Sequence, residues 1–248
     1  MSESIKKGLP EESNKGAFGQ TFSRKKFLKY AGMSAAAAAT LGFYGCEEDG
    51  PMGPDPEPKP EAVNLGSGDV GILNYAYALE QLEAAFYISV VDMPYDGMST
   101  EEGAIFEDIR AHEVAHRDFF EAALSSVAAD AIIPGLTPKF EEIDFTSRDN
   151  VLTIAKTFED LGVSAYNGAG DLLETTDYLL QAGKIVSVEA RHASIIRSLI
   201  QPGSGYFAGD DIVDQNGLGL ANDPSVVLQA AAPFITETID GSGLPQPQ

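Results

Sequence analysis

Two pairs of glutamate and histidine are the residues of this sequence best suited to chemistry. Glu113 precedes His116 by three positions, and Glu189 precedes His192 by three positions. Residues i and i+3 lie on one face of an α-helix, so each pair points a carboxylate and an imidazole in the same direction. Each pair can therefore supply two ligands to a metal ion. The sequence contains three histidines, and two of them close this pattern.

Two further glutamates occur in a second repeated pattern. Glu80 lies seven residues before Tyr87, and Glu159 lies seven residues before Tyr166. Apolar residues recur on the helical faces of both glutamates, which predicts that these carboxylates face the core. A carboxylate buried without a partner is costly, so it needs a metal ion, another cation or a proton. Glu83, three residues after Glu80, is the alternative ligand on that segment.

Helical periodicity occupies four long stretches that must position these side chains. We predict helices over residues 70–91, 99–129, 147–182 and 184–200, with Gly183 as the C-terminal cap of the third. Because the repeated glutamates are separated by similar lengths of chain, the sequence indicates two related helix pairs that face each other.

The connections between these stretches predict the fold class. A segment of 17 residues separates the second helix from the third, and the other connections are short. This arrangement is typical of an all-α, up-down-up-down four-helix bundle with one long crossover. Ser99 and Glu102 form a capping-box pattern at the start of the second helix. Asp223 and Pro224 begin a short fifth helix that is predicted to reach Ala232.

With these ligand types on four helices, the sequence resembles the ferritin-like di-metal carboxylate superfamily, especially its bacterial ferritin-like and desiccation-related branch. The best local matches are the segment from Leu79 to Tyr87 and the segment His112-Glu113-Val114-Ala115-His116. The resemblance covers roughly residues 66 to 200. In that superfamily, two helices supply one glutamate each and the other two supply Glu-x-x-His.

The resemblance implies two divalent metal ions, iron or manganese, in the bundle core. The implied ligands are Glu80, Glu113 and His116 for one ion and Glu159, Glu189 and His192 for the other, with Glu113 and Glu189 as bridges. Oxygen and nitrogen ligands suit these metals, and zinc would also bind them. The implied activity is redox chemistry with a small-molecule oxidant, and oxidase, peroxidase, catalase and ferroxidase reactions can share such ligands. Tyr87 and Tyr166 are candidates for redox or ligand-supporting roles, beside the plainer role of core aromatics.

Two other functions remain open at this level. His112-Glu113-x-x-His116 is also the zinc-protease signature, but that interpretation leaves Glu189 and His192 unexplained. In the ferritin-like interpretation, His112 lies beside the metal-facing side of its helix and supports the site or faces the surface. The desiccation-related likeness adds a non-catalytic envelope or stress-protection protein in which the metal is structural.

The first 45 residues resemble an export signal. The segment Ser23-Arg24-Lys25-Lys26-Phe27-Leu28-Lys29 resembles a twin-arginine signal with Lys25 in place of the second arginine, which leaves general secretory (Sec) export as the alternative. An Ala-rich apolar run follows, and Phe43-Tyr44-Gly45-Cys46 resembles a lipobox whose cysteine is lipidated. We therefore predict an exported periplasmic or cell-surface protein with a lipid anchor at Cys46.

The remaining sequence divides into a linker, a bundle and a C-terminal segment. Residues 46–65 are acidic and proline-rich, which is typical of a stiff spacer, residues 66–200 are the predicted bundle, and residues 201–248 are a loop with the short helix. After residue 45 there are nine basic and 35 acidic residues, which argues against nucleic acid and anionic lipid as partners of this surface. The lone cysteine cannot form an internal disulfide. A tether on every subunit suits a monomer or homodimer better than a closed cage.

Overall fold

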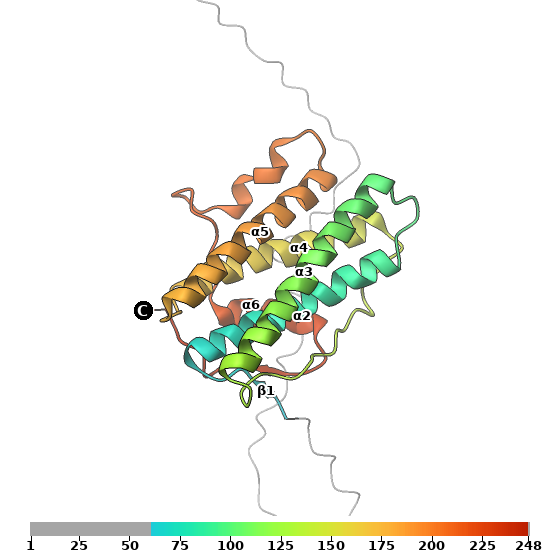
Figure 1. Cartoon of the computed structure of the whole chain (residues 1–248). Coiled ribbons are helices and arrows are strands. Elements are labelled where there is room, and N and C mark those ends of the chain that lie inside the picture. Colours follow the sequence, from blue (N-terminus) through green and yellow to red (C-terminus); the bar gives the residue numbers. More distant parts are fainter. Residues whose placement is uncertain (1–60, 248) are drawn as a thin grey trace, which may run out of the picture. The chain divides into compact units, whose positions relative to one another are not determined.

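The computed structural model describes residues 61–247, and four long helices dominate them (Figure 1). These helices are α2 (Gly68–Asp92), α3 (Thr100–Val127), α4 (Arg148–Gly170) and α5 (Thr176–Ile200). Helices α2 and α3 pack as one antiparallel pair, and α4 and α5 pack as another. The segment 128–147 connects the two pairs. The predicted all-α bundle with a long crossover is confirmed.

The helix starts follow the local capping chemistry. The Ser99 side chain accepts a hydrogen bond from the Glu102 amide, while the Glu102 carboxylate accepts one from the Ser99 amide, so the predicted capping box is present. At the start of α4, the Ser147 side chain accepts a hydrogen bond from the Asn150 amide. Both caps fix helices that carry residues of the candidate site.

The predicted boundary between the third and fourth helices is wrong. Helix α4 ends at Gly170 rather than near residue 182, and Gly183 lies inside α5 instead of capping a helix. The reason is a contact from a distant part of the chain: the Asp69 carboxylate on α2 accepts hydrogen bonds from the amides of Glu174 and Thr175. These bonds fix the turn, and α5 begins immediately after it.

Helix α2 is buried on nearly every side, with 16 of its 25 residues buried. The crossover segment runs along its outer face and is held by two polar side chains of α2. Asn74 donates to the carbonyl of Ala131 and accepts from the amide of Ile133, and Gln81 accepts from the amide of Leu136. The crossover therefore has fixed backbone partners although it forms no helix.

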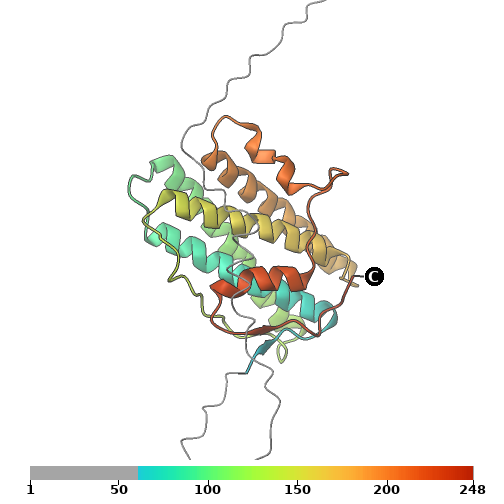
Figure 2. The ribbon, with the colours of Figure 1, turned by 180° about the vertical axis from the view of Figure 1, so that it is seen from behind.

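The chain after the bundle folds back onto it. Two 3-10 turns, η1 (Gly205–Ala208) and η2 (Asp210–Ile212), precede helix α6 (Pro224–Ala231), the 3-10 turn η3 (Ala232–Phe234) and strand β2 (Ile239–Asp240). The short fifth helix is therefore present where it was predicted. It lies on the side of the bundle formed by α2 and α4 (Figure 2), with Val227 and Ala231 buried in the core. At Gly168 of α4, an added Cβ would lie only 2.0 Å from the carbonyl oxygen of Asn222, so this close approach requires glycine.

The predicted linker 46–65 extends too far into the folded part. Strand β1 (Val63–Asn64) pairs in parallel with β2, and Leu65 is fully buried. The predicted export signal, the lipidation site Cys46 and the proline-rich spacer lie outside the described residues. Among residues 61–247, no helix has the length and apolar character needed to cross a membrane.

Candidate metal centre

The structure brings together the six side chains that the sequence singled out. Glu80 comes from α2, Glu113 and His116 from α3, Glu159 from α4, and Glu189 and His192 from α5. The four glutamates are 0 % exposed, and the side chains of His116 and His192 are 13 % and 5 % exposed. Four carboxylates and two imidazoles therefore share one buried space in the middle of the bundle.

These side chains form two overlapping groups. Glu80, Glu113, His116 and Glu189 make up the first group, and Glu113, Glu159, Glu189 and His192 make up the second. Within each group, one potential ligand atom per residue lies within 4.8 Å of the others. Glu113 and Glu189 belong to both groups, so each presents its carboxylate to two positions.

The contacts cross between the helix pairs. His116 Nδ1 lies 2.9 Å from Glu189 Oε1 and 3.4 Å from oxygens of Glu80 and Glu113. His192 Nδ1 lies 2.7 Å from Glu113 Oε1 and 3.5 Å from oxygens of Glu159 and Glu189. Each imidazole is thus closest to the shared glutamate of the opposite pair.

The unsatisfied polar atoms test whether this cluster fits metal ions. Among residues 61–247, eight buried oxygen and nitrogen atoms of the six side chains lie within 3.5 Å of one another but make no well-oriented hydrogen bond: Glu80 Oε2, both oxygens of Glu113, His116 Nδ1, Glu159 Oε2, both oxygens of Glu189 and His192 Nδ1. Buried polar atoms are normally paired, and a cluster of unpaired ones is costly. Ligand atoms around 2.0–2.2 Å from a shared ion would lie roughly 3 Å apart, close to the spacings seen here. The cluster therefore fits metal ions.

Two tyrosines orient Glu80 and Glu159, the two glutamates that belong to only one group each, from the opposite helix pair. Tyr87 on α2 donates a hydrogen bond to Glu159 Oε1 on α4, and Tyr166 on α4 donates one to Glu80 Oε1 on α2. In both carboxylates the other oxygen, Oε2, is left for the cluster. Burial, followed by the negative charge of the bonded glutamate, raises the pKa of both phenols well above the ordinary value. Both hydroxyls consequently remain protonated donors.

His112 supports one imidazole and lies outside both groups. Its Nδ1 lies 2.8 Å from Nε2 of His192, and the two rings stack with centroids 5.1 Å apart. A hydrogen bond to the nitrogen that faces away from a metal fixes the tautomer and ring orientation of a histidine. Because His192 Nδ1 faces the cluster, His112 holds His192 in a position to bind through that nitrogen.

The charges within the cluster shift the pKa of its carboxyl groups in opposite directions. Burial raises the pKa of Glu80 well above its usual range and that of Glu159 to about 8. Burial also acts on Glu113, but the facing imidazoles of His116 and His192 outweigh it and lower its pKa to about 2. One central carboxyl group therefore stays ionised while two outer ones favour a proton.

The two imidazoles respond to the same charges. Burial alone would lower the pKa of His116 and His192, but the surrounding carboxylates outweigh it and raise both pKa values to about 12. In the absence of metal, the imidazoles therefore carry protons on the atoms that face the cluster. Metal ions must displace these protons, so protons and metal compete for the same site.

Glu83, the alternative to Glu80, is buried but belongs to neither group of potential ligands. It packs against Gly162 of α4, where an added Cβ would lie 3.0 Å from Glu83 Oε1. Burial, followed by the charges of the nearby glutamates, raises its pKa well above the usual value. The structure therefore favours Glu80 over Glu83 as the residue of α2 that faces the cluster.

The fold and the cluster define a class of protein: four-helix bundles that hold carboxylates and histidines in their core. Residues 68–202 match the family described as the ferritin-like domain, and this match spans more than half of the chain. The chain belongs to the ferritin-like domain family, as its sequence resemblance indicated. Among curated proteins, none matches the chain. The family match and the geometry together assign the fold and a buried cluster that could hold metal ions.

Proposed function

We propose that this chain binds two divalent metal ions, iron or manganese, and uses them in redox chemistry with oxygen or peroxide. The observation that carries the proposal is the set of eight buried carboxylate and imidazole atoms without a well-oriented hydrogen bond, in two groups that share Glu113 and Glu189. In this proposal Glu80 and His116 would hold one ion, Glu159 and His192 would hold the other, and Glu113 and Glu189, which belong to both groups, would contribute to both. Four carboxylates and two neutral imidazoles balance the charge of two divalent cations.

The residues around the cluster would prepare it for this chemistry. Bound iron or manganese supplies the one-electron oxidation and reduction that amino-acid side chains lack. Tyr87 holds Oε1 of Glu159, and Tyr166 holds Oε1 of Glu80. His112 holds the ring of His192. Complete burial of the four glutamates keeps bulk water away from the ligands. The protein thus supplies orientation and a dry, charge-balanced environment.

The rival interpretations are less consistent with this geometry. A zinc protease would need His112 and His116 on one ion, yet neither group of potential ligands among the described residues includes His112. A structural metal in a non-catalytic envelope protein uses the same cluster and differs only in its lack of turnover. Export, and lipid anchoring through Cys46, are part of the proposal on the basis of the N-terminal sequence alone.

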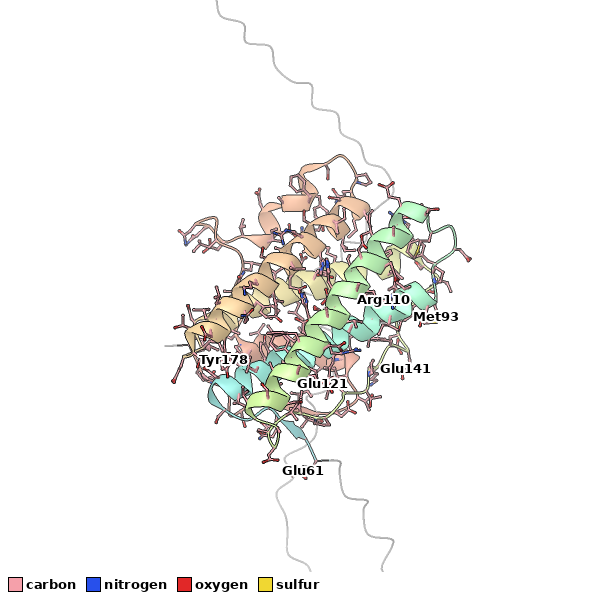
Figure 3. All side chains as sticks on the ribbon, viewed as in Figure 1. Glu61, Met93, Arg110, Glu121, Glu141 and Tyr178 are labelled. Atoms are coloured by element: carbon pink, nitrogen blue, oxygen red, sulfur yellow. The ribbon has the colours of Figure 1, made fainter. Side chains whose placement is uncertain are left out.

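Elemental analysis of the purified full chain tests the metal site. Glu113→Gln removes a charged shared ligand and should reduce the metal content of both positions, from two ions per chain to less than one. Glu121→Gln is the matched control, because Glu121 is exposed on the same helix (Figure 3) and should leave two ions bound. Full retention of metal by Glu113→Gln would contradict the proposal. One zinc ion per chain that survives His192→Ala would support a protease instead.

Turnover separates an enzyme from a structural metal protein. The chain loaded with iron or manganese should consume peroxide over many cycles, or oxygen when a reductant is supplied, and Glu113→Gln should lose this activity together with its metal. If two ions bind and no turnover occurs with either oxidant, the metal is structural and the redox part of the proposal fails.

A further inference from the structure

Glu83 is a buried carboxyl group that is not among the ligands of the proposed metal centre. It is 5 % exposed and belongs to neither group of potential ligands. Burial, followed by the charges of glutamates from all four long helices, raises the pKa of Glu83 well above its usual value. A carboxyl group buried among others is costly unless a positive charge or a proton compensates it. Its presence beside the cluster therefore needs a physical reason.

The two halves of the bundle are related by an approximate two-fold axis. Tyr87 of α2 bonds Glu159 of α4, and Tyr166 of α4 bonds Glu80 of α2. The two histidines of the cluster each contact the shared glutamate of the opposite pair in the same reciprocal way. Reciprocal contacts of this kind are what a two-fold axis produces. Helices α2 and α4 are therefore equivalent elements on the two sides of the axis.

Glu83 and Gly162 occupy the same position in the two halves and face each other. Glu83 lies three residues after Glu80, and Gly162 lies three residues after Glu159. A Cβ added at Gly162 would lie 3.0 Å from Glu83 Oε1 and 3.6 Å from Oε2. Equivalent positions that face each other lie next to the axis, and here there is room for only one of the two side chains. The carboxyl group of Glu83 fills the space that glycine leaves on α4.

This position gives Glu83 the same relation to both groups of potential ligands. The axis exchanges the two groups, so a side chain beside the axis is about equally far from each. The four glutamates whose charges act on Glu83 most strongly are the four that belong to the groups, with the shared Glu189 and Glu113 first. Glu83 is therefore a fifth carboxyl group common to the whole cluster.

The charge balance of the centre gives this fifth carboxyl group a role. Four glutamates and two neutral imidazoles balance two divalent ions, with a total charge of four. Loss of one electron from either ion raises that total to five, and a fifth carboxylate restores the balance. We propose that Glu83 stabilises the oxidised state of the centre by offsetting this additional positive charge from a point common to both ions. The inference rests on the proposed function, because it requires two redox-active ions.

Oxidation by peroxide removes one electron from each ion. Peroxide accepts these two electrons and two protons, and its O–O bond breaks to give two water molecules. The state in which a single electron has been removed lies between the two ends of this reaction. Because Glu83 is common to both groups, its charge acts on whichever ion is oxidised. A negative charge acts more strongly in a buried site than in water, so its removal should raise the reduction potential of the centre.

A redox titration of the iron-loaded full chain tests this role. The half-oxidised pair of ions has an odd number of electrons and is detected by electron paramagnetic resonance. Glu83→Gln keeps the shape of the side chain and removes its charge. It should raise the potential by about 59 mV or more, a tenfold change for a one-electron couple. Glu121→Gln, which removes a carboxylate from the exposed face of α3 (Figure 3), should leave the potential unchanged.

The metal content of Glu83→Gln separates a charge-compensating residue from a ligand. Because Glu83 belongs to neither group of potential ligands, elemental analysis should still find two ions per chain in this variant. Circular dichroism checks that the variant is folded.

The internal repeat supplies a second variant. Glu83→Gly combined with Gly162→Glu moves the carboxyl group from α2 to the equivalent position on α4. If the charge beside the axis matters and the helix that carries it does not, the potential should return to that of the unchanged chain. A role confined to the charge-free packing of Glu83 would not produce this rise and recovery.

Three outcomes would overturn the inference. The first is a folded Glu83→Gln variant with two ions and an unchanged potential. The second is the loss of an ion from this variant, which would make Glu83 a ligand. The third is a folded double variant that holds two ions and keeps the raised potential. An unchanged chain that binds fewer than two ions, or whose ions cannot be oxidised, would instead refute the proposed function and this inference with it, before any variant is compared.

Discussion

The two helix pairs supply the same types of ligand to the cluster but support them differently. In the α4–α5 pair, the side chain of His192 is 5 % exposed, and its Nε2 is held by His112. In the α2–α3 pair, the side chain of His116 is 13 % exposed, and no residue among 61–247 holds its Nε2 as His112 holds that of His192. A ligand that is already oriented loses less freedom on binding. The repeated pattern in sequence therefore gives two groups of side chains, one of which is held in place more firmly than the other.

The two pairs are also stabilised by different kinds of contact. Arg197 of α5 is 1 % exposed and forms paired hydrogen bonds with Asp160 of α4 and with Asp211 of the C-terminal segment, while its guanidinium lies 4.8 Å from the centre of the Tyr206 ring. In the α2–α3 pair, the neutral side chain of Asn74 on α2 binds the backbone of the crossover segment. The buried polar side chain of one half is thus charged, and that of the other half is neutral.

The largest expected effect comes from removing the buried charge of the α4–α5 pair. Arg197→Met should lower the free energy of unfolding by about 3 kcal/mol, because four charged hydrogen bonds of a buried guanidinium to Asp160 and Asp211 are lost, although Lys156 still pairs with Asp160. Arg110→Met is the control in the other pair (Figure 3), because Arg110 pairs with Glu107 on the exposed face of α3 and should cost less than about 0.5 kcal/mol. Urea unfolding of both variants measures the difference. Equal losses would show that the buried network does not distinguish the two halves.

Removal of His112 tests directly whether the two proposed metal positions are supported unequally. His112→Gln takes away the imidazole that orients His192, and the loss of such a supporting group typically weakens metal binding by about 10–100-fold. We expect this loss at the position served by His192 and little change at the one served by His116. Manganese titration, followed by calorimetry, resolves the two steps. Asp108→Asn is the control, because Asp108 is exposed on the same helix and its replacement should leave both affinities unchanged. An equal weakening of both binding steps in His112→Gln would mean that the two positions are not separately supported.

Tyr87 and Tyr166, which each bond a glutamate of the opposite helix pair, should contribute equally to stability, in contrast to the two histidines. Tyr87→Phe and Tyr166→Phe each remove one hydrogen bond to a buried carboxyl group and should each cost about 1–2 kcal/mol of stability. Thermal or urea unfolding of the metal-free variants gives these values. A difference larger than about 1 kcal/mol between them would show that the inequality of the halves extends beyond the histidines.

The site residues were predictable from sequence where the chemistry is local. A Glu-x-x-His pair lies on one helical face whatever surrounds it, so Glu113 with His116 and Glu189 with His192 could be identified from spacing alone. The partners of Tyr87 and Tyr166 could not, because each bonds a glutamate that is more than 70 residues away on another helix. The bond between His112 and His192 could not be predicted for the same reason, because the two residues are 80 positions apart.

The errors in the predicted fold also come from contacts between residues that are distant in the sequence. Gly183 resembles a helix cap, yet the real break lies earlier, at a turn bound by Asp69 more than 100 residues away. The signals that could have indicated it are Thr175, Thr176 and Asp177, a capping residue and an acidic first turn. The pairing of β1 with β2 joins the two ends of the described chain, and no local sequence pattern predicts a strand of only two residues.

Asp69 links the two helix pairs, and its replacement should have the smallest effect. The carboxylate extends from α2 to the turn before α5, and although burial acts in the opposite direction, hydrogen bonds from Thr175 and Glu174 lower its pKa. A lowered pKa in the folded state means that the stabilisation is present above the unfolded pKa of about 3.9 and is lost as pH falls through the folded value. Asp69→Asn should therefore cost about 1 kcal/mol at pH 7, and the gap to the unchanged chain should narrow towards pH 3. Urea unfolding of both proteins at the two pH values measures this gap, and a gap that stays constant or widens in acid would show that the ionised carboxylate does not hold the turn.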